Sequence, residues 1–193
     1  MAEPGNHPKT GVMGSRRLFV ALWPDPGTAR VLSRIAARAH ALCGGRPMRS
    51  DTLHLTLAFL GTVAGDRIPP LCEMIRTWAP RGGELVLDRF GRFKGPRIVW
   101  AGPSEPWPAW LDALHAELWA RLRQLGFPTS DEPFRPHVSL LRKAGPADPA
   151  PLGGGRPIAW RPRRCVLVAS MPRETGSYYE ALAECAVAPG DAP

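Results

Sequence analysis

Two short segments of the chain each place a histidine two positions before a hydroxyl residue. The first is His54-Leu55-Thr56-Leu57 and the second is His137-Val138-Ser139-Leu140. Residues i and i+2 of a strand share a face, so each segment would present an imidazole beside a hydroxyl while its aliphatic residues point into apolar packing. A lone strand histidine is usually structural, but two copies of one pattern indicate a paired site.

An acid–base pair is the chemistry that fits two imidazoles and two hydroxyls best. Near neutral pH one imidazole can be neutral while the other is protonated. Such a pair can act on opposite sides of one phosphorus atom, where one histidine activates a nucleophile and the other protonates the leaving oxygen. The hydroxyls of Thr56 and Ser139 would donate hydrogen bonds to the non-bridging phosphate oxygens.

Other uses of the histidines fit less well. A zinc site takes four ligands, or three and an open position, and neither segment contains a carboxylate or a thiol. A Ser-His-Asp triad needs one histidine and a buried carboxylate rather than two equivalent histidines. We therefore predict no metal. We also predict no catalytic role for the three remaining histidines, His7, His40 and His115. We interpret His115, which lies in the longest predicted helix, as a core residue.

Periodicity predicts the elements that must position these side chains. The two histidine strands are expected at Thr52–Leu60 and Pro136–Leu141. Five further strands are predicted at Arg16–Trp23, Glu84–Phe93, Arg97–Ala101, Arg163–Ala169 and Tyr178–Ala186. Apolar residues spaced by three and four predict helices at Thr28–Cys43, Pro69–Trp78 and Ala109–Leu125. Because the helices are few and irregularly placed, this order predicts an α+β fold with a largely antiparallel sheet.

Length and composition indicate a soluble globular domain. The chain has 193 residues, of which 44% are hydrophobic and 22% charged. Its longest apolar runs are far too short to span a bilayer, and its N-terminus lacks the apolar region of a secretory signal. The four cysteines contain no Cys-x-x-Cys pair, which favours reduced thiols in a cytoplasmic protein. We expect flexible tails at 1–15 and 188–193 around a single domain at 16–187.

The charge balance is basic, with 25 Lys and Arg against 17 Asp and Glu and a net charge of +8. Only three of the basic residues are lysine, and the planar guanidinium of arginine is well suited to phosphate. A polyanionic partner is therefore plausible. Because a preference for arginine can also be a habit of a whole genome, charge alone does not decide the partner.

The chain resembles the 2H phosphoesterase superfamily, which is named for two His-x-Thr/Ser-x motifs. Within it, the chain is most similar to the bacterial RNA 2',3'-cyclic phosphodiesterases, which are also described as 2'-5' RNA ligases. The matching segments are spread over about residues 16–187 and comprise 16–23, 50–61, 89–102, 134–145 and 166–182.

The resemblance implies a bilobal fold of two similar halves, each with an antiparallel sheet and flanking helices, and an active-site cleft between them. It assigns the catalytic proton donor to His54 and the proton acceptor to His137, with phosphate contacts from Thr56, Ser139 and Arg142. The implied reaction hydrolyses RNA 2',3'-cyclic phosphate ends to 2'-phosphates, with a reversible 2'-5' ligation in relatives. It requires no metal and no cofactor. We expect a monomer whose partner is RNA and that does not bind a membrane.

Arg142 can contact the phosphate only if the backbone departs from regular strand geometry. Strict alternation places Leu141, not Arg142, on the histidine face, so Arg142 reaches the phosphate only if the strand ends or bulges there. Four aromatic residues are candidates for stacking on a base or for core packing: Phe59, Trp100, Tyr178 and Tyr179.

Two alternatives to an RNA cyclic phosphodiesterase remain open. One is a phosphodiesterase that acts on a small cyclic nucleotide. The other is a non-catalytic RNA-binding module whose histidines contact phosphate, although a binder gains nothing particular from an acid–base pair.

Overall fold

A large antiparallel sheet and three α-helices form the fold. The computed structural model describes residues 14–129, 133–173 and 176–190. The helices are α1 (Pro26–Cys43), α2 (Ile68–Thr77) and α3 (Ala109–Gln124). Each begins and ends within two residues of the helix predicted from periodicity. The α+β class and the largely antiparallel sheet are thus confirmed.

The main sheet has the strand order β11-β10-β1-β3-β8-β7-β6, and every neighbouring pair in it is antiparallel. Its strands, from one edge to the other, are β11 (Gly176–Ala186), β10 (Arg164–Arg173), β1 (Arg16–Trp23), β3 (Leu55–Val63), β8 (Val138–Arg142), β7 (Ile98–Gly102) and β6 (Arg89–Phe93). The short β2 (Arg46–Pro47) also pairs with β8.

Two short strand pairs lie outside this sheet. β5 (Leu85–Leu87) pairs with β9 (Ile158–Trp160), and β4 (Arg81–Gly82) pairs in parallel with β12 (Ala188–Pro189). β9 lies in a stretch where periodicity predicts neither a strand nor a helix. β12 lies at the start of the predicted C-terminal tail, whose last residues, 191–193, fall outside the described residues, as do 1–13 of the N-terminal tail.

The main sheet is joined at its centre by one residue pair. β3 and β8 are linked only through Leu55 and Val138, whereas β1 and β10 pair over seven residues. Strands β11, β10, β1 and β3 therefore form one set, and β8, β7 and β6 form a second set that meets the first at this point. The two histidine segments begin on either side of this junction.

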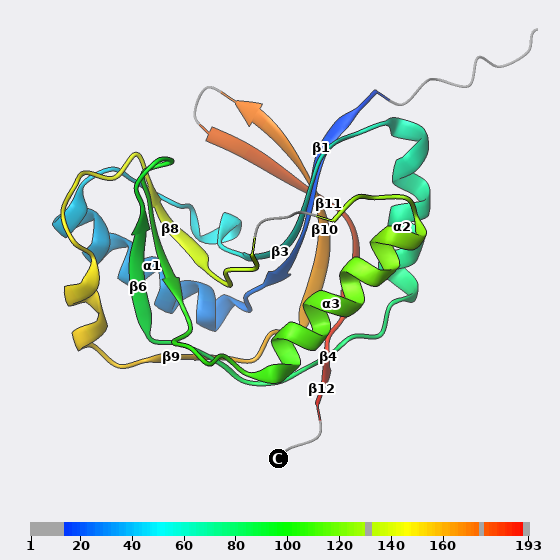
Figure 1. Ribbon diagram of the computed structural model, residues 1–193. Helices are drawn as coiled ribbons and strands as arrows, with labels where there is room; N and C mark the ends of the chain where they lie inside the picture. The colour runs from blue at the N-terminus through cyan, green and yellow to red at the C-terminus, as the bar shows by residue number, and fades with distance from the viewer. Residues whose placement is uncertain (1–13, 130–132, 174–175, 191–193) are drawn as a thin grey trace, which may run out of the picture.

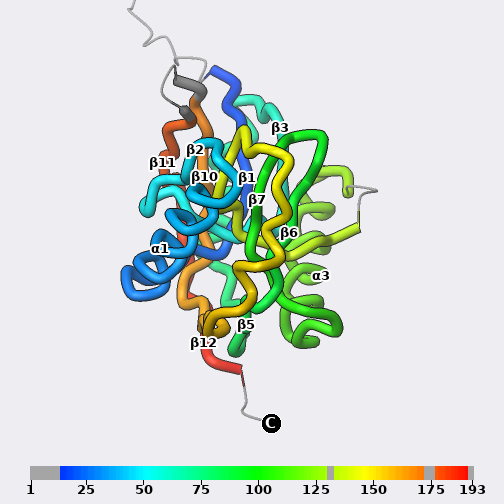
Figure 2. Tube along the Cα trace, turned by 90° about the vertical axis from the view of Figure 1, so that its left-hand side faces the viewer, coloured from blue at the N-terminus to red at the C-terminus, as the bar shows by residue number. Residues whose placement is uncertain are grey.

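The helices do not pack on the strands that precede them in the chain. Helix α1 follows β1 but packs against β8 and β2, while α3 follows β7 but lies against β3. Helix α2 packs against β10 and β11. Figure 1 shows α1 on the side of β6 and β8 and the other two helices on the opposite side, and Figure 2 shows α1 to one side of β7 and β6. These crossings tie the two strand sets together.

Local signals explain where α1 begins and ends. The carboxylate of Asp25 accepts hydrogen bonds from the backbone N–H groups of Gly27 and Thr28, and proline occupies the first helical position. The helix ends before Gly44, whose φ of 62° is a left-handed conformation that glycine adopts without steric cost.

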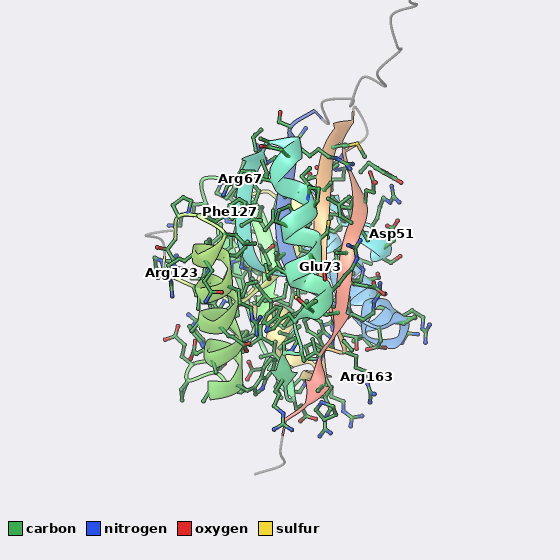
Figure 3. The ribbon with its side chains drawn as sticks, turned by 90° about the vertical axis from the view of Figure 1, so that its right-hand side faces the viewer. Asp51, Arg67, Glu73, Arg123, Phe127 and Arg163 are labelled. Atoms are coloured by element: carbon green, nitrogen blue, oxygen red, sulfur yellow. The ribbon has the colours of Figure 1, made fainter. Side chains whose placement is uncertain are left out.

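A contact between α2 and the end of α3 closes the helical side of the first strand set. The Arg67 guanidinium lies 3.9 Å from the centre of the Phe127 ring and donates a hydrogen bond of 2.8 Å to the Leu125 carbonyl. Figure 3 shows Arg67 and Phe127 next to each other at the upper ends of the two helices. A cation over an aromatic face adds to the apolar packing between these helices.

Strand β1 separates two apolar clusters on its two faces. Leu18, Val20 and Leu22 point to the main core under the helices. Phe19 and Ala21 point the other way, where they form a smaller cluster with Val166 and Val168 of β10. Strand alternation thus explains why β1 is apolar on both faces from Leu18 to Trp23. The second cluster lies on the face that carries the candidate site.

Candidate active site

The junction between β3 and β8 brings the two histidine segments together. Leu55 pairs with Val138 in an antiparallel register. One step in each direction sets His54 opposite Ser139 and Thr56 opposite His137, and directly opposite residues project to the same face. The two segments are thus related by an approximate twofold axis at the junction. Local pattern could predict each segment but not this pairing.

Both histidines precede their strands, which begin later than the pattern predicted. A short 3₁₀ turn, Ser50–Thr52, comes before the first segment, and Pro136 directly before the second has no N–H for a strand ladder. The Nδ1 atom of His54 lies 2.7 Å from the Thr52 carbonyl, and that of His137 lies 2.7 Å from the Arg135 carbonyl.

These two hydrogen bonds determine the tautomer of each ring. A carbonyl oxygen only accepts hydrogen bonds, so Nδ1 of each imidazole carries a proton. In the neutral ring the other nitrogen, Nε2, then has a free lone pair. Each histidine therefore holds its ring by Nδ1 and keeps Nε2 available to take or give a proton.

An aromatic enclosure surrounds His54. Its ring stacks on Phe19 at a centroid distance of 4.8 Å and on Trp23 at 5.4 Å, while Tyr179 contacts it edge-on at 5.5 Å. Burial among these rings lowers the pKa of His54 from 6.5 to about 4, opposed by the hydrogen bond to Thr52. The positive charges of His137 and Arg142 lower this pKa further.

A looser aromatic setting surrounds His137. Phe93 contacts the imidazole edge-on at 4.9 Å, and Trp100 lies 6.4 Å away. Burial lowers the pKa of His137 below its ordinary value, and the hydrogen bond to the Arg135 carbonyl opposes that shift. Burial favours the neutral form of both histidines in the free protein.

The enclosing aromatics Phe19 and Trp23 were not among the residues that the sequence predicted for the site. The sequence does contain a signal for them, because residues 18–23 are apolar on both strand faces and only one face can line the main core. Of the two adjacent tyrosines, Tyr179 contacts His54, and Tyr178 is 39% exposed.

Strand β8 contains a bulge that changes the side on which Arg142 lies. Trp100 pairs with Ser139 and Val99 with Leu141, so Leu140 is an extra residue in β8. Leu140 and Leu141 are both fully buried, and the alternation resumes one residue later. Arg142 therefore lies on the same face as Ser139. The condition that β8 must end or bulge before Arg142 can reach that face is thus met.

Strand β3 has a matching bulge at the corresponding position. Ala21 pairs with Thr56 and Val20 with Ala58, which leaves Leu57 as the extra residue. Phe59 consequently occupies in the first segment the position that Arg142 occupies in the second. It is 50% exposed, and the Arg17 guanidinium lies 4.8 Å from its ring centre.

The two candidate stacking aromatics, Phe59 and Trp100, differ in their packing. Trp100 lies directly over Gly91, where an added Cβ would come within 2.2 Å of the indole, and it also contacts Phe93. Trp100 is thus packed against Gly91 and Phe93. Phe59, in contrast, lines an open cavity of about 1020 Å³ that also reaches Phe93 and His137.

Two arginines give the cavity beside Phe59 and His137 a basic lining. Arg123 of α3 and Arg135 before His137 both border it. A smaller cavity of about 180 Å³ lies beside Trp23 and Tyr179. The part of the chain that the structure describes holds no group of three or more side chains suited to a metal ion. None of its helices is long and apolar enough to cross a membrane.

Comparison with known proteins finds similarity to phosphoesterases. Residues 22–100 match the family model described as LigT like phosphoesterase. The chain is 38% identical over 110 residues to the RNA 2',3'-cyclic phosphodiesterase of Escherichia coli K12, which covers 57% of this chain and 62% of that protein. It is 30% identical over 131 residues to the enzyme of the same name from Geobacillus stearothermophilus, covering 65% of this chain and 41% of that protein. These alignments span less than two thirds of either relative.

Solved structures match over nearly the whole fold. The E. coli LigT structure without ligand superposes with a TM-score of 0.75 and 28% identity, covering 91% of this chain and 99% of that one. The E. coli LigT complex with 3'-AMP gives a TM-score of 0.74 and 29% identity over 90% of this chain and 98% of that one. These findings confirm the resemblance that the two histidine segments indicated.

Proposed function

We propose that the chain, which is similar in sequence and in fold to LigT-like phosphoesterases, hydrolyses RNA 2',3'-cyclic phosphodiester ends to 2'-phosphomonoesters. The observation that carries the proposal is the pair of histidines directly before two neighbouring strands, each held by a hydrogen bond from Nδ1 to a backbone carbonyl. This arrangement leaves two Nε2 atoms for proton transfer on one face of the sheet.

In the proposed reaction, His137 acts as the general base and His54 as the general acid. Nε2 of His137 takes a proton from water as the water oxygen attacks phosphorus. The bond between phosphorus and O3' breaks, and His54 delivers its proton to that oxygen. The 2'-phosphate ester remains, and proton exchange with solvent restores both histidines. In the ligation direction a 5'-hydroxyl of a second RNA end replaces water.

Three side chains would stabilise the charge that develops on the non-bridging oxygens. The hydroxyls of Thr56 and Ser139, both half-buried, would each donate one hydrogen bond. Arg142 would offer two parallel N–H donors and a positive charge, which is a geometry suited to phosphate. Such donors contribute most when they are held in place before the reaction begins.

The single-pair junction between the two strand sets supports a bilobal reading of the fold. In that reading the β1 set and the β8 set are the two halves, and the site lies where they meet. The approximate twofold relation of the two bulged segments agrees with it. Phe59 and the basic cavity beside His137 would hold the nucleoside part of the RNA end, because aromatic faces stack on any base.

Hydrolysis of a defined RNA end tests the proposed function directly. We expect the purified protein to convert a short oligoribonucleotide with a 2',3'-cyclic phosphate end into a 2'-phosphate product, which chromatography against 2'- and 3'-phosphate standards identifies. A 3'-phosphate product would contradict the assigned direction of bond cleavage. No turnover of the cyclic end would contradict the function itself.

The same assay separates an RNA enzyme from one that acts on small cyclic nucleotides. Contacts to several phosphates release counterions, so kcat/KM for the oligonucleotide should fall more steeply with salt than kcat/KM for a mononucleotide 2',3'-cyclic phosphate. Equal salt slopes would mean that only the terminal phosphate is held, and this result would favour the small-nucleotide alternative.

The lowered histidine pKa values predict an acidic optimum for kcat/KM. One histidine must be protonated and the other neutral, so the profile should be a bell whose limbs belong to the coupled pair. Because burial lowers the pKa of His54 to about 4 and also lowers the pKa of His137, we expect the maximum of kcat/KM below about pH 6.5. The bound phosphate is negative and raises both pKa values, so the maximum of kcat should lie at higher pH.

This prediction is checked by steady-state kinetics from about pH 4 to 9 in buffers of constant ionic strength, with protein stability verified at each pH. Coincident optima for kcat and kcat/KM, or a kcat/KM maximum above pH 7, would show that the burial seen in the free protein does not govern its titration.

A further inference from the structure

His115 of α3 lies between the first histidine segment and the residues that precede the second. Its ring stacks on Phe134 at a centroid distance of 3.9 Å and an interplanar angle of 14°. Its Nε2 accepts a hydrogen bond of 3.0 Å from the indole N–H of Trp119. Leu57, Phe134, His115 and His137 all line the same cavity. The sequence predicted only a packed core histidine at this position.

The contacts of His115 determine its tautomer. Because Nε2 accepts from the Trp119 indole, which can only donate, the proton of the neutral ring is on Nδ1. Burial lowers the pKa of His115, whereas the charge of Asp112 and a hydrogen bond to the backbone of Leu57 act in the opposite direction. Among backbone groups only a carbonyl favours the protonated imidazole in this way, so the Leu57 oxygen is the group that Nδ1–H of His115 faces.

The backbone of Leu57 has a particular need for a partner outside the sheet. It is the extra residue of the β3 bulge, and a bulged residue is left without a pairing partner on the neighbouring strand. In the second segment, a backbone N–H provides the partner for the corresponding carbonyl. There the carbonyl of its extra residue, Leu140, accepts a hydrogen bond of 2.8 Å from the backbone N–H of Met48. His115 is thus the side-chain counterpart of a backbone donor.

Phe134 connects His115 to the second segment. It lies three residues before His137, and the buried Pro136 stands between them. Proline restricts both its own φ and the conformation of the residue before it, so this short stretch has few ways to move. A ring stacked on Phe134 therefore constrains the backbone that carries His137.

We propose that His115 is a positioning residue that holds the two histidine segments in register across the site, through the Leu57 carbonyl on one side and the Phe134 ring on the other. The inference rests on the proposed acid–base function. His115 itself does not touch the reacting atoms. It acts through His54, which is three residues before Leu57, and through His137.

Two substitutions separate the two contacts of His115. His115→Ala removes both the Nδ1–H donor and the ring. His115→Phe keeps an aromatic ring for Phe134 but has no donor for Leu57. The matched control is His40→Ala, which removes an exposed histidine near the end of α1. The readouts are kcat and KM on the cyclic-phosphate RNA, together with backbone and imidazole NMR signals.

We expect His115→Ala to lower kcat by about tenfold or more, because small displacements of reacting groups are costly, while KM changes by less than about threefold. His115→Phe should recover part of this loss. In NMR spectra, His115→Phe should shift the Leu57 and Ala58 amides and leave the His137 imidazole unchanged. His115→Ala should shift both sets of signals, and His40→Ala neither.

The proposal is overturned if a folded His115→Ala protein has the kcat of the His40→Ala control, or if its His137 and Leu57 signals match the wild type. Should the alanine variant not fold, an unchanged kcat and an unchanged Leu57 amide in His115→Phe overturn it equally. If the wild-type protein does not turn over the cyclic phosphate, the proposed function fails, and the NMR comparison still decides whether His115 positions the segments.

Discussion

Replacing His54 or His137 with alanine is expected to lower kcat by roughly 10²–10⁴-fold, the range usual for loss of a general acid or base. Each histidine would supply one of the two proton transfers, and no other imidazole among the described residues is tied into the β3–β8 junction in this way. The double variant should be little worse than the poorer single variant, because groups that act as a unit are not additive.

The measurement is kcat on the cyclic-phosphate oligonucleotide, with His40→Ala as the control for removing a histidine. Circular dichroism and the thermal midpoint identify any loss that comes from unfolding. His54 is enclosed by aromatic rings, so His54→Gln provides a second variant that fills more of the space than alanine. Full activity in a His137→Ala protein would contradict the acid–base mechanism. So would inhibition by EDTA that zinc reverses, because that result would indicate a metal-dependent reaction.

Arg142→Ala is expected to lower kcat/KM by about 10- to 100-fold, which corresponds to the loss of hydrogen bonds to a charged group. Arg142→Lys should recover only part of this loss. Lysine keeps the positive charge but offers a point donor on a flexible stem in place of a planar fork. The thermal midpoint should stay nearly unchanged in both variants, because Arg142 is the last residue of β8 and is not fully buried.

Arg34→Ala is the control for Arg142, since Arg34 is an exposed residue of α1. The comparison separates a phosphate clamp from a general contribution of positive charge. Wild-type kcat/KM in both Arg142 variants would remove this residue from the site. Equal activity of Arg142→Lys and the wild type, with a loss only in Arg142→Ala, would show that charge matters and the geometry of the guanidinium does not.

Arg142 also illustrates the limit of reasoning from strand alternation. Strict alternation places Leu141 on the histidine face, so Arg142 joins that face only if the strand ends or bulges, and the register with β7 contains a bulge. Whether a strand bulges depends on its register with a partner, and the partner of β8 here is β7, about 40 residues earlier in the chain. The sequence of one strand alone does not specify its register with a distant partner.

The aromatic enclosure of His54 depends on long-range packing in the same way. Phe19, Trp23 and Tyr179 come from β1 and β11, at opposite ends of the chain. They meet at His54 because β3 and β10 lie on either side of β1 and β10 in turn pairs with β11. The lowered pKa of His54 follows from this assembly and has no counterpart in the segment His54–Leu57 itself.

The α+β class, the three helices and the main strands follow from local patterns in the sequence, and so do the two segments that carry the imidazoles and hydroxyls. These features are local, because helical and strand periodicity and the spacing of a histidine and a hydroxyl lie within a few residues. Only the tertiary structure shows that α1 packs on β8 and α3 on β3. The bulge at the fourth residue of both segments, and the position of His115 beside the first bulge, likewise appear only there. These outcomes depend on which apolar faces bury one another and on the register between distant strands, and a short stretch of sequence specifies neither.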